Sequence, residues 1–112
     1  MEARERVLQE YITLAGHNPF AAWLRPIRDN TTRARIRTRL SRLRLGNFGD
    51  ARSVGEGVHE LRLDFGPGYR VYYGLVDETV VLLLGGGDKR SQPRDIREAK
   101  AHWQEFQDHH AH

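Results

Sequence analysis

GPGYRVYYGLVDETVVLLLGGGDKRSQ, residues 66–92, contains two apolar segments joined by a short turn sequence. In the first segment, Val71 and Tyr73 alternate with Arg70 and Tyr72, as side chains do on the two faces of a strand. The second segment, VVLLL, is apolar throughout, which is typical of a strand covered on both faces. The intervening VDET predicts a tight turn, so the stretch predicts an antiparallel hairpin.

The sequence before this hairpin predicts a third strand. From residue 58 the period is again two, with Leu61 and Leu63 on one face and Glu60 and Arg62 on the other. The tetrapeptide FGPG then predicts a turn, because its glycines tolerate positive φ. Three consecutive strands on short turns predict an antiparallel meander.

The N-terminal part predicts a strand and a short helix. Residues 6–14, RVLQEYITL, are rich in β-branched and aromatic residues and favour a strand, although a helix remains an alternative. Asn18 is a typical N-cap and Pro19 suits a first helical turn. Apolar residues at helical spacing follow, and Pro26 is expected to kink or end the helix.

Two further helices complete the fold prediction. The first is expected to begin at a cap on Asn30 or Thr31 and to end at Gly46. The second begins near Gln92 and Pro93, and its core side carries Ile96, Ala99, Trp103 and Phe106. The sequence therefore predicts an α+β fold in the order β-α-α-β-β-β-α, with a helical hairpin packed on an antiparallel sheet.

Composition limits the class of protein. The chain has 112 residues, which suggests one domain over 1–112, with a frayed tail from about residue 108. It is 38% hydrophobic and 29% charged and contains no cysteine. We expect a cytoplasmic protein that does not enter a membrane and has no thiolate chemistry.

Basic charge is concentrated in one predicted helix. Between residues 30 and 46 there are six arginines and no acidic residue, while the whole chain carries a net charge of only +3. Such a segment suits a polyanionic partner, most often a nucleic acid, and equally suits a solvated face or an acidic protein. The candidate RNA-binding residues are Arg33, Arg35, Arg37, Arg39, Arg42 and Arg44.

A second group of cations lies on the polar face of the predicted hairpins and at their end. Arginine and lysine side chains can hold a phosphate and stabilise its charge during transfer, while a phenol can stack on a base. Ordinary cross-strand ion pairs, such as Glu60 with Arg70, are the alternative. The candidate catalytic residues are Glu60, Arg62, Arg70, Tyr72, Lys89 and Arg90.

Two other motifs carry little weight. GGGDKR lacks the spacing of a phosphate-binding P-loop, and the glycines are expected to let the chain leave the sheet. HHAH, residues 109–112, could chelate an ion but lies at the chain end. We expect no metal and no cofactor.

The combination of GNFGD, GV.ELR, GPGYRVYY and GGDK..Q..DI..A, spread over about residues 6–106, resembles the addiction-module killer proteins. These form a HigB-like branch of the RelE/ParE superfamily of bacterial toxins. The resemblance implies a RelE-like, microbial RNase-type fold. It also implies a type II toxin-antitoxin system, in which a small helix-turn-helix antitoxin silences the toxin.

RelE-like toxins cut mRNA in the ribosomal A site without a metal, so the resemblance implies a ribosome-dependent endoribonuclease. By motif, Arg70 matches the family's phosphate-binding arginine, and Arg90 matches a second functional arginine beside Lys89. Glu60 and Arg62 stand where some members have two lysines, and Ile96 stands where some have a tyrosine, which are departures. Tyr72, His59 or Lys89 are the candidate substitutes.

Two other functions stay open. A ParE-like toxin would share the fold and inhibit gyrase by binding, without residues that cleave RNA. An inactive toxin would act only as a corepressor with its antitoxin, and the departures at Glu60 and Ile96 keep that alternative open.

Overall fold

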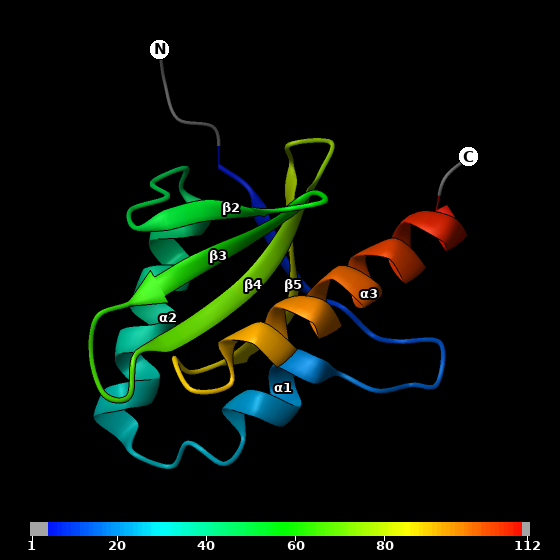
Figure 1. Ribbon diagram of the computed structural model, residues 1–112. Helices are drawn as coiled ribbons and strands as arrows, with labels where there is room; N and C mark the ends of the chain where they lie inside the picture. The colour runs from blue at the N-terminus through cyan, green and yellow to red at the C-terminus, as the bar shows by residue number, and fades with distance from the viewer. Residues whose placement is uncertain (1–4, 111–112) are drawn as a thin grey trace.

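The computed structural model describes residues 5–110 as an α+β fold, in which one five-stranded mixed sheet is covered by helices (Figure 1). The strand order across the sheet is β1-β5-β4-β3-β2. No helix within residues 5–110 is both long enough and apolar enough to span a bilayer. In chain order the elements are β1 (Val7–Glu10), α1 (Pro19–Leu24), α2 (Asn30–Arg44), β2 (Ala51–Gly55), β3 (Val58–Leu63), β4 (Tyr69–Val76), β5 (Val80–Gly87) and α3 (Gln92–His110).

The predicted meander is confirmed. β3 pairs antiparallel with β4, and β4 pairs antiparallel with β5. The register places Glu60 opposite Tyr72 and Arg62 opposite Arg70, so these polar residues share one face as the alternation predicted. The β4–β5 ladder is irregular between Tyr72 and Tyr73.

The prediction of a purely antiparallel sheet with four strands is wrong in two respects. β1 pairs parallel with β5, because the chain crosses over through α1, α2 and the meander before it returns beside β1. β2 was not predicted, because ARSVG lies at the sheet edge, with Arg52 and Ser53 exposed and no apolar alternation. Edge strands of this kind are short and polar, which protects them from further pairing.

Several helix and strand boundaries differ from the prediction. Asn18 caps α1 as predicted, and its side chain accepts a hydrogen bond from the Ala21 N–H. Asp29, rather than Asn30 or Thr31, caps α2 by accepting from the Thr32 N–H. β1 occupies only four residues of the predicted 6–14 strand. α3 continues through residues 108–110, where a frayed tail was predicted, and residues 111–112 lie outside the described part of the chain.

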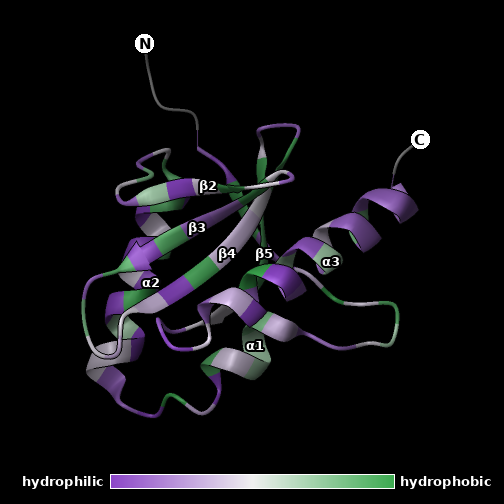
Figure 2. Cartoon of the chain, in the orientation of Figure 1, coloured by the Kyte–Doolittle hydropathy of each residue, from purple (hydrophilic) through white to green (hydrophobic). Residues whose placement is uncertain are grey.

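Helices cover both faces of the sheet, so the core has two layers (Figure 2). α1 and α2 bury Phe20, Leu24 and Ile36 against one face, together with Leu61 and Tyr73 from the strands. α3 covers the other face, where the buried residues include Tyr72, Leu82, Leu84, Ala99 and Trp103. The polar residues of the β3–β4 face therefore lie on the α3 side of the sheet.

Two glycines allow the helices to approach the sheet closely. A Cβ at Gly74 would lie 2.3 Å from the Trp103 ring, and a Cβ at Gly86 would lie 2.3 Å from the Trp23 ring. Each tryptophan therefore packs directly on the backbone of a strand. The apolar area that each ring buries is available only because these strand positions have no side chain.

The β4–β5 turn contains a strained pair of residues. Asp77 and Glu78 both have positive φ, 51° and 57°, and the Thr79 N–H donates to the Val76 carbonyl, so the two are the central residues of a type I′ turn within a three-residue loop. The two-residue β2–β3 turn also has positive φ at both positions, but glycine stands at the second position, Gly57, after Glu56. A side chain in the left-handed region costs about 1 kcal/mol relative to glycine, so the β4–β5 turn is the less favourable of the two.

We expect Glu78→Gly to raise the free energy of unfolding by about 1 kcal/mol, because glycine adopts the required φ without the Cβ clash. Glu78→Gln removes the same charge but keeps the side chain, and should change stability by less than about 0.5 kcal/mol. Chemical denaturation of both variants measures the difference. Equal effects would assign any gain to the lost charge.

Candidate functional site: a buried carboxylate surrounded by arginines

Glu60 is the centre of the polar face under α3. It lies in the middle of β3 and its side chain is fully buried. Its Oε1 lies 3.2 Å from Arg52 Nε and 3.5 Å from Arg62 Nε, and its Oε2 lies 4.0 Å from Arg70 Nε. The cross-strand pairing of Glu60 with Arg70, which the sequence left as an alternative, is therefore present at the long limit of an ion pair.

Two neutral groups complete the shell around this carboxylate. The Tyr72 hydroxyl donates to Glu60 Oε2 at 3.1 Å, and Gln92 Nε2 donates to the same oxygen at 2.7 Å. Burial raises the pKa of Glu60, but the hydrogen bonds from Gln92, Tyr72 and Arg52 outweigh it and hold the pKa below its ordinary value. Glu60 is therefore ionised, and it links β2, β3, β4 and α3.

Tyr72 is not placed to stack on a base. Its ring is 1% exposed and packs in the core beneath α3. Burial, with the charge and hydrogen bond of Glu60, raises the pKa of Tyr72 well above its ordinary value, so the phenol stays protonated. It serves as a hydrogen-bond donor to Glu60, and the predicted stacking role does not fit this conformation.

Arg70 lies beneath the β3–β4 turn and is only 6% exposed. Its Nη1 donates to the carbonyls of Gly68 and Tyr69 at 3.2 and 3.3 Å. Its Nε is buried and makes no hydrogen bond within the described part of the chain. The protein thus holds this guanidinium in place but leaves one charged N–H without a hydrogen-bond acceptor, which is unusual for a buried donor.

Lys89 approaches the same turn from the end of β5. A Cβ at Gly68 would lie 3.3 Å from Lys89 Cβ and 3.6 Å from Arg70 Nη1, so both cations flank this glycine. Arg90 follows, and its N–H donates to Asp88 Oδ1 at 2.9 Å. Lys89 and Arg90 are both exposed. The structure therefore brings Lys89 to Arg70, and places Arg90 on the adjacent surface loop.

Sequence reasoning missed three members of this site. Arg52 comes from β2, the strand that was not predicted, so nothing indicated that it faces Glu60. Gln92 was read only as a helix start. Asp95 is 8% exposed, accepts a hydrogen bond from the Ser91 hydroxyl, and fits because Gly87 has no side chain. A polar residue at a core position of the last helix is the pattern that could have identified Asp95.

His59 is excluded from the site by its orientation. Its ring stacks on Tyr73 at 5.2 Å between centroids, and Tyr73 belongs to the core layer beneath α1 and α2. Burial lowers the pKa of His59, which favours the neutral ring. His59 therefore lies across the sheet from Glu60 and does not substitute for a base there.

The six arginines of α2 do not act as one set. Arg33 Nη1 donates to the carbonyls of Leu24 and Ile27, and Arg44 pairs with Glu5. The Arg35 guanidinium lies 4.1 Å from the centroid of the Phe65 ring. Arg35, Arg39 and Arg42 line one surface pocket, whereas Arg33 and Arg37 line another. The predicted basic helix therefore presents two separate basic surfaces.

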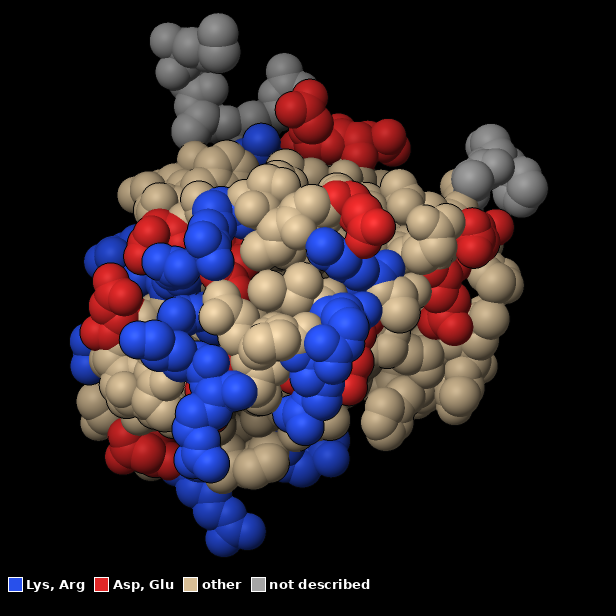
Figure 3. Space-filling view, viewed as in Figure 1, with Lys and Arg blue, Asp and Glu red and all other residues tan. Residues whose placement is uncertain are grey.

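Basic side chains also gather beyond α2 (Figure 3). In this view they form two bands with uncharged surface between them. Within residues 5–110, no group of three histidine, aspartate or glutamate side chains is arranged to hold a metal ion. Around Glu60 the side chains provide fixed cations, hydrogen-bond donors and a buried carboxylate.

Glu60→Gln tests the central carboxylate. At neutral pH we expect the free energy of unfolding to fall by about 3 kcal/mol, because three arginines lose their shared partner. The lowered pKa of Glu60 means that its contribution is complete above its ordinary value of 4.5 and is lost as the pH falls through the folded-state value. Denaturation at several pH values should show the two proteins converging in acid.

The exposed carboxylate Glu56, which lies 3.7 Å from Lys100, provides the matched control. Glu56→Gln should cost less than about 1 kcal/mol at every pH. A Glu60→Gln difference that did not shrink in acid would contradict an ionised Glu60.

Comparison with known proteins gives one informative result. The chain is 46% identical over 87 residues to an uncharacterized protein of Haemophilus influenzae, and the match covers 78% of this chain and 88% of that protein. No protein-family model matches the chain, and no solved structure matches it. Identity at this level over most of both sequences shows common descent. The chain therefore belongs to the same family as this Haemophilus influenzae protein.

Proposed function

We propose that this protein is a type II toxin of the RelE/ParE superfamily, with a HigB-like, ribosome-dependent endoribonuclease activity toward mRNA. The single observation that carries the proposal is the position of the Arg70 guanidinium and its contacts. The guanidinium is anchored beneath a glycine turn by the carbonyls of Gly68 and Tyr69, and Lys89 lies beside the same turn. The motif GYR places the same arginine where the resembling toxins bind phosphate.

The arrangement suits the stabilisation of a scissile phosphate. Arginine binds phosphate oxygens through a planar fork, and a fixed cation needs no reorganisation when charge develops on the phosphate. Arg70 is nearly buried, so RNA would reach its outer edge at the Pro67–Gly68 turn, where the exposed Lys89 adds a second cation. Arg90 on the next loop position would contact the backbone of the same RNA.

The proposed reaction is attack of a ribose 2′-OH on the adjacent phosphate. The 2′ oxygen gives its proton to solvent water and forms a bond to phosphorus, which leaves a 2′,3′-cyclic phosphate, while the bond from phosphorus to the 5′ oxygen breaks and that oxygen takes up a proton. Lys89 is the exposed group that can donate this proton. Glu60 is ionised but buried, so its role is to position Arg52, Arg62 and Arg70, and the ribosome would orient the 2′-OH.

The strand and helix order supports the family assignment in part. The antiparallel β3–β4–β5 meander with α1 and α2 packed on one face is compatible with the RelE-like expectation of an antiparallel sheet with two helices on one side. The proposal includes the partners that the resemblance implies, which are a small helix-turn-helix antitoxin, the ribosome and mRNA.

A second candidate is a toxin fold that binds without cleaving RNA, as a corepressor or as a ParE-like inhibitor of gyrase. The burial of Glu60 and Tyr72 favours it, because the two groups are hydrogen-bonded to each other and neither is free to accept a proton from RNA. The two functions make different predictions for RNA, because only the first produces new RNA ends.

We expect induction of the protein alone to arrest growth and to produce new RNA 5′ ends within translated codons. Arg70→Ala and Arg90→Ala should each reduce these ends by about 100-fold or more, because each removes a cation from the transferring phosphate. Transcriptome-wide mapping of 5′ ends measures the effect. Arg97→Ala, an exposed arginine further along α3, is the control and should cut normally.

Three outcomes would contradict the ribonuclease. Growth arrest without new ends would favour gyrase, and normal growth without new ends would favour a corepressor. Cleavage that Arg90→Ala leaves intact would remove the site, and Arg90 is exposed, so this variant is expected to fold.

The basic surface of α2 that contains Arg35, Arg39 and Arg42 provides a separate prediction. Ribosome binding by the triple variant Arg35→Gln, Arg39→Gln, Arg42→Gln should weaken, and the slope of log affinity against log salt should fall by about 2 to 3, because fewer counterions are released. Filter binding at several salt concentrations measures this slope. Arg44→Gln is the control, since Arg44 already pairs with Glu5; an unchanged slope in the triple variant would assign this surface to another partner.

A further inference from the structure

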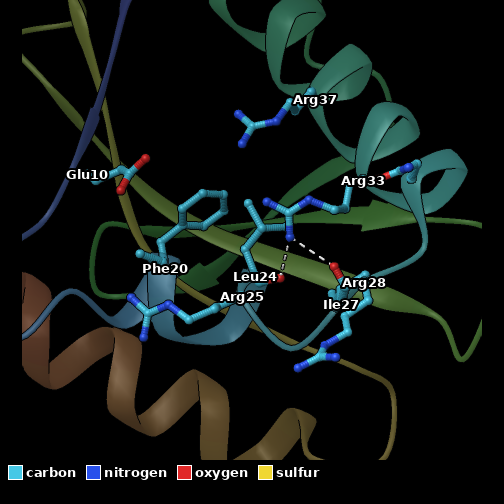
Figure 4. A pocket seen from close by; sticks show the side chains of 10 residues that line it. Glu10, Phe20, Leu24, Arg25, Ile27, Arg28, Arg33 and Arg37 are labelled. Carbon is cyan, nitrogen blue, oxygen red and sulfur yellow. Dashed lines mark hydrogen bonds between the residues drawn. The ribbon is translucent and has the colours of Figure 1, made fainter.

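A pocket of about 480 Å³ lies between α1 and α2, across the sheet from Glu60 (Figure 4). Its apolar floor includes Phe20 and Leu24, which belong to the core layer beneath these two helices. Tyr72 and the catalytic candidates lie in the other layer. The pocket is therefore separate from the proposed phosphate site, and its volume lies in the usual range for small-ligand sites.

Four arginines give the pocket its charge. Figure 4 shows Arg33 and Arg37 extending from α2 toward the middle of the pocket, with Arg25 and Arg28 on the α1 side. Arg33 is held by the carbonyls of Leu24 and Ile27, both at 2.9 Å, so its remaining N–H groups are fixed in direction. Asn30 adds an amide to the lining.

The protein does not neutralise these four cations. Among residues 5–110, none of the four pocket arginines has a carboxylate oxygen within 4.0 Å. Arg44, Arg52 and Arg62 do have one, whereas exposed arginines outside the pocket, such as Arg90 and Arg97, also have none. The one acidic lining residue is Glu10, whose Oε1 accepts a hydrogen bond from Asn18 Nδ2 at 2.8 Å. A concave surface concentrates the positive potential of such a group.

We propose that the α1–α2 pocket binds phosphate groups, from a free nucleotide or from an RNA chain. Phosphate is favoured over a single carboxylate by charge and by shape. A phosphomonoester carries about −1.5 to −2 charges at neutral pH. Its oxygens are arranged as a tetrahedron and can meet the forks of arginines from α2 and from the α1–α2 connection, whereas the two oxygens of a carboxylate accept hydrogen bonds in one plane.

Substitution of Glu10 is expected to change the affinity for anions in the opposite direction from substitution of the pocket arginines. Its carboxylate faces the pocket from the end of β1 and repels an entering anion. We expect Glu10→Gln to tighten anion binding several-fold, because one like charge is removed from the pocket. The inference does not depend on the proposed ribonuclease, because the pocket lies on the other face of the sheet.

Calorimetric titration of the full chain with pyrophosphate, at constant ionic strength, tests the proposal. We expect saturable binding that Arg37→Gln weakens by about tenfold or more, the loss typical of a hydrogen bond between charged groups. Arg35→Gln removes the same charge from the opposite flank of α2, beside Phe65, and should stay within about twofold of the wild type. Arg33→Gln is not used, because Arg33 also holds the α1–α2 connection.

ATP, and RNA oligonucleotides with a 5′-phosphate or a 5′-hydroxyl, identify the source of the phosphate. Preference for ATP over both RNAs assigns a free nucleotide, and preference for the phosphorylated RNA assigns an RNA end; either result supports the site. Absence of saturable pyrophosphate binding would overturn the proposal. Equal losses in Arg37→Gln and Arg35→Gln, or preference for a polyglutamate peptide, would also overturn it, because they would indicate a general basic surface or a protein partner.

Discussion

One buried carboxylate organises the α3 face of this protein. Glu60 is fully buried in β3, and it receives hydrogen bonds or ion pairs from β2, β3, β4 and the first turn of α3. A buried charge is costly unless it is paired, so these partners must be in place whenever the fold is complete. The edge strand, the meander and the last helix are therefore joined by a single side chain.

This arrangement also decides which groups remain free for chemistry. Glu60 accepts a hydrogen bond from Tyr72 and lies among Arg52, Arg62 and Arg70. Several residues that were predicted to be catalytic therefore bind one another and stabilise the fold. Of the candidate catalytic residues, Lys89 and Arg90 are exposed, and Arg70 is nearly buried beneath the turn at Gly68. In such an arrangement the arginines are held in fixed positions, because the buried carboxylate of Glu60 pairs with them.

The strand alternation in residues 58–73, the apolar segment VVLLL and the short turns were sufficient to predict the meander, and a period of two assigned the polar side chains to one face. The face shared by Glu60, Arg62, Arg70 and Tyr72 followed from it. Alternation carries no information on strand direction or on edges, so the parallel β1–β5 pair and β2 were missed. The burial of Tyr72 and the hydrogen bond from Gln92 to Glu60 depend on the position of α3. A local sequence pattern does not determine that position.

The close packing of aromatic rings on glycine gives the two layers separate optical reporters. The chain has two tryptophans, and each lies in a different layer: Trp23 of α1 packs on Gly86, and Trp103 of α3 packs on Gly74. Intrinsic fluorescence of a protein that retains only one of them would follow the solvation of that layer alone. The order in which the two faces of the sheet become solvated during unfolding is thus readable from emission wavelength, without an added label.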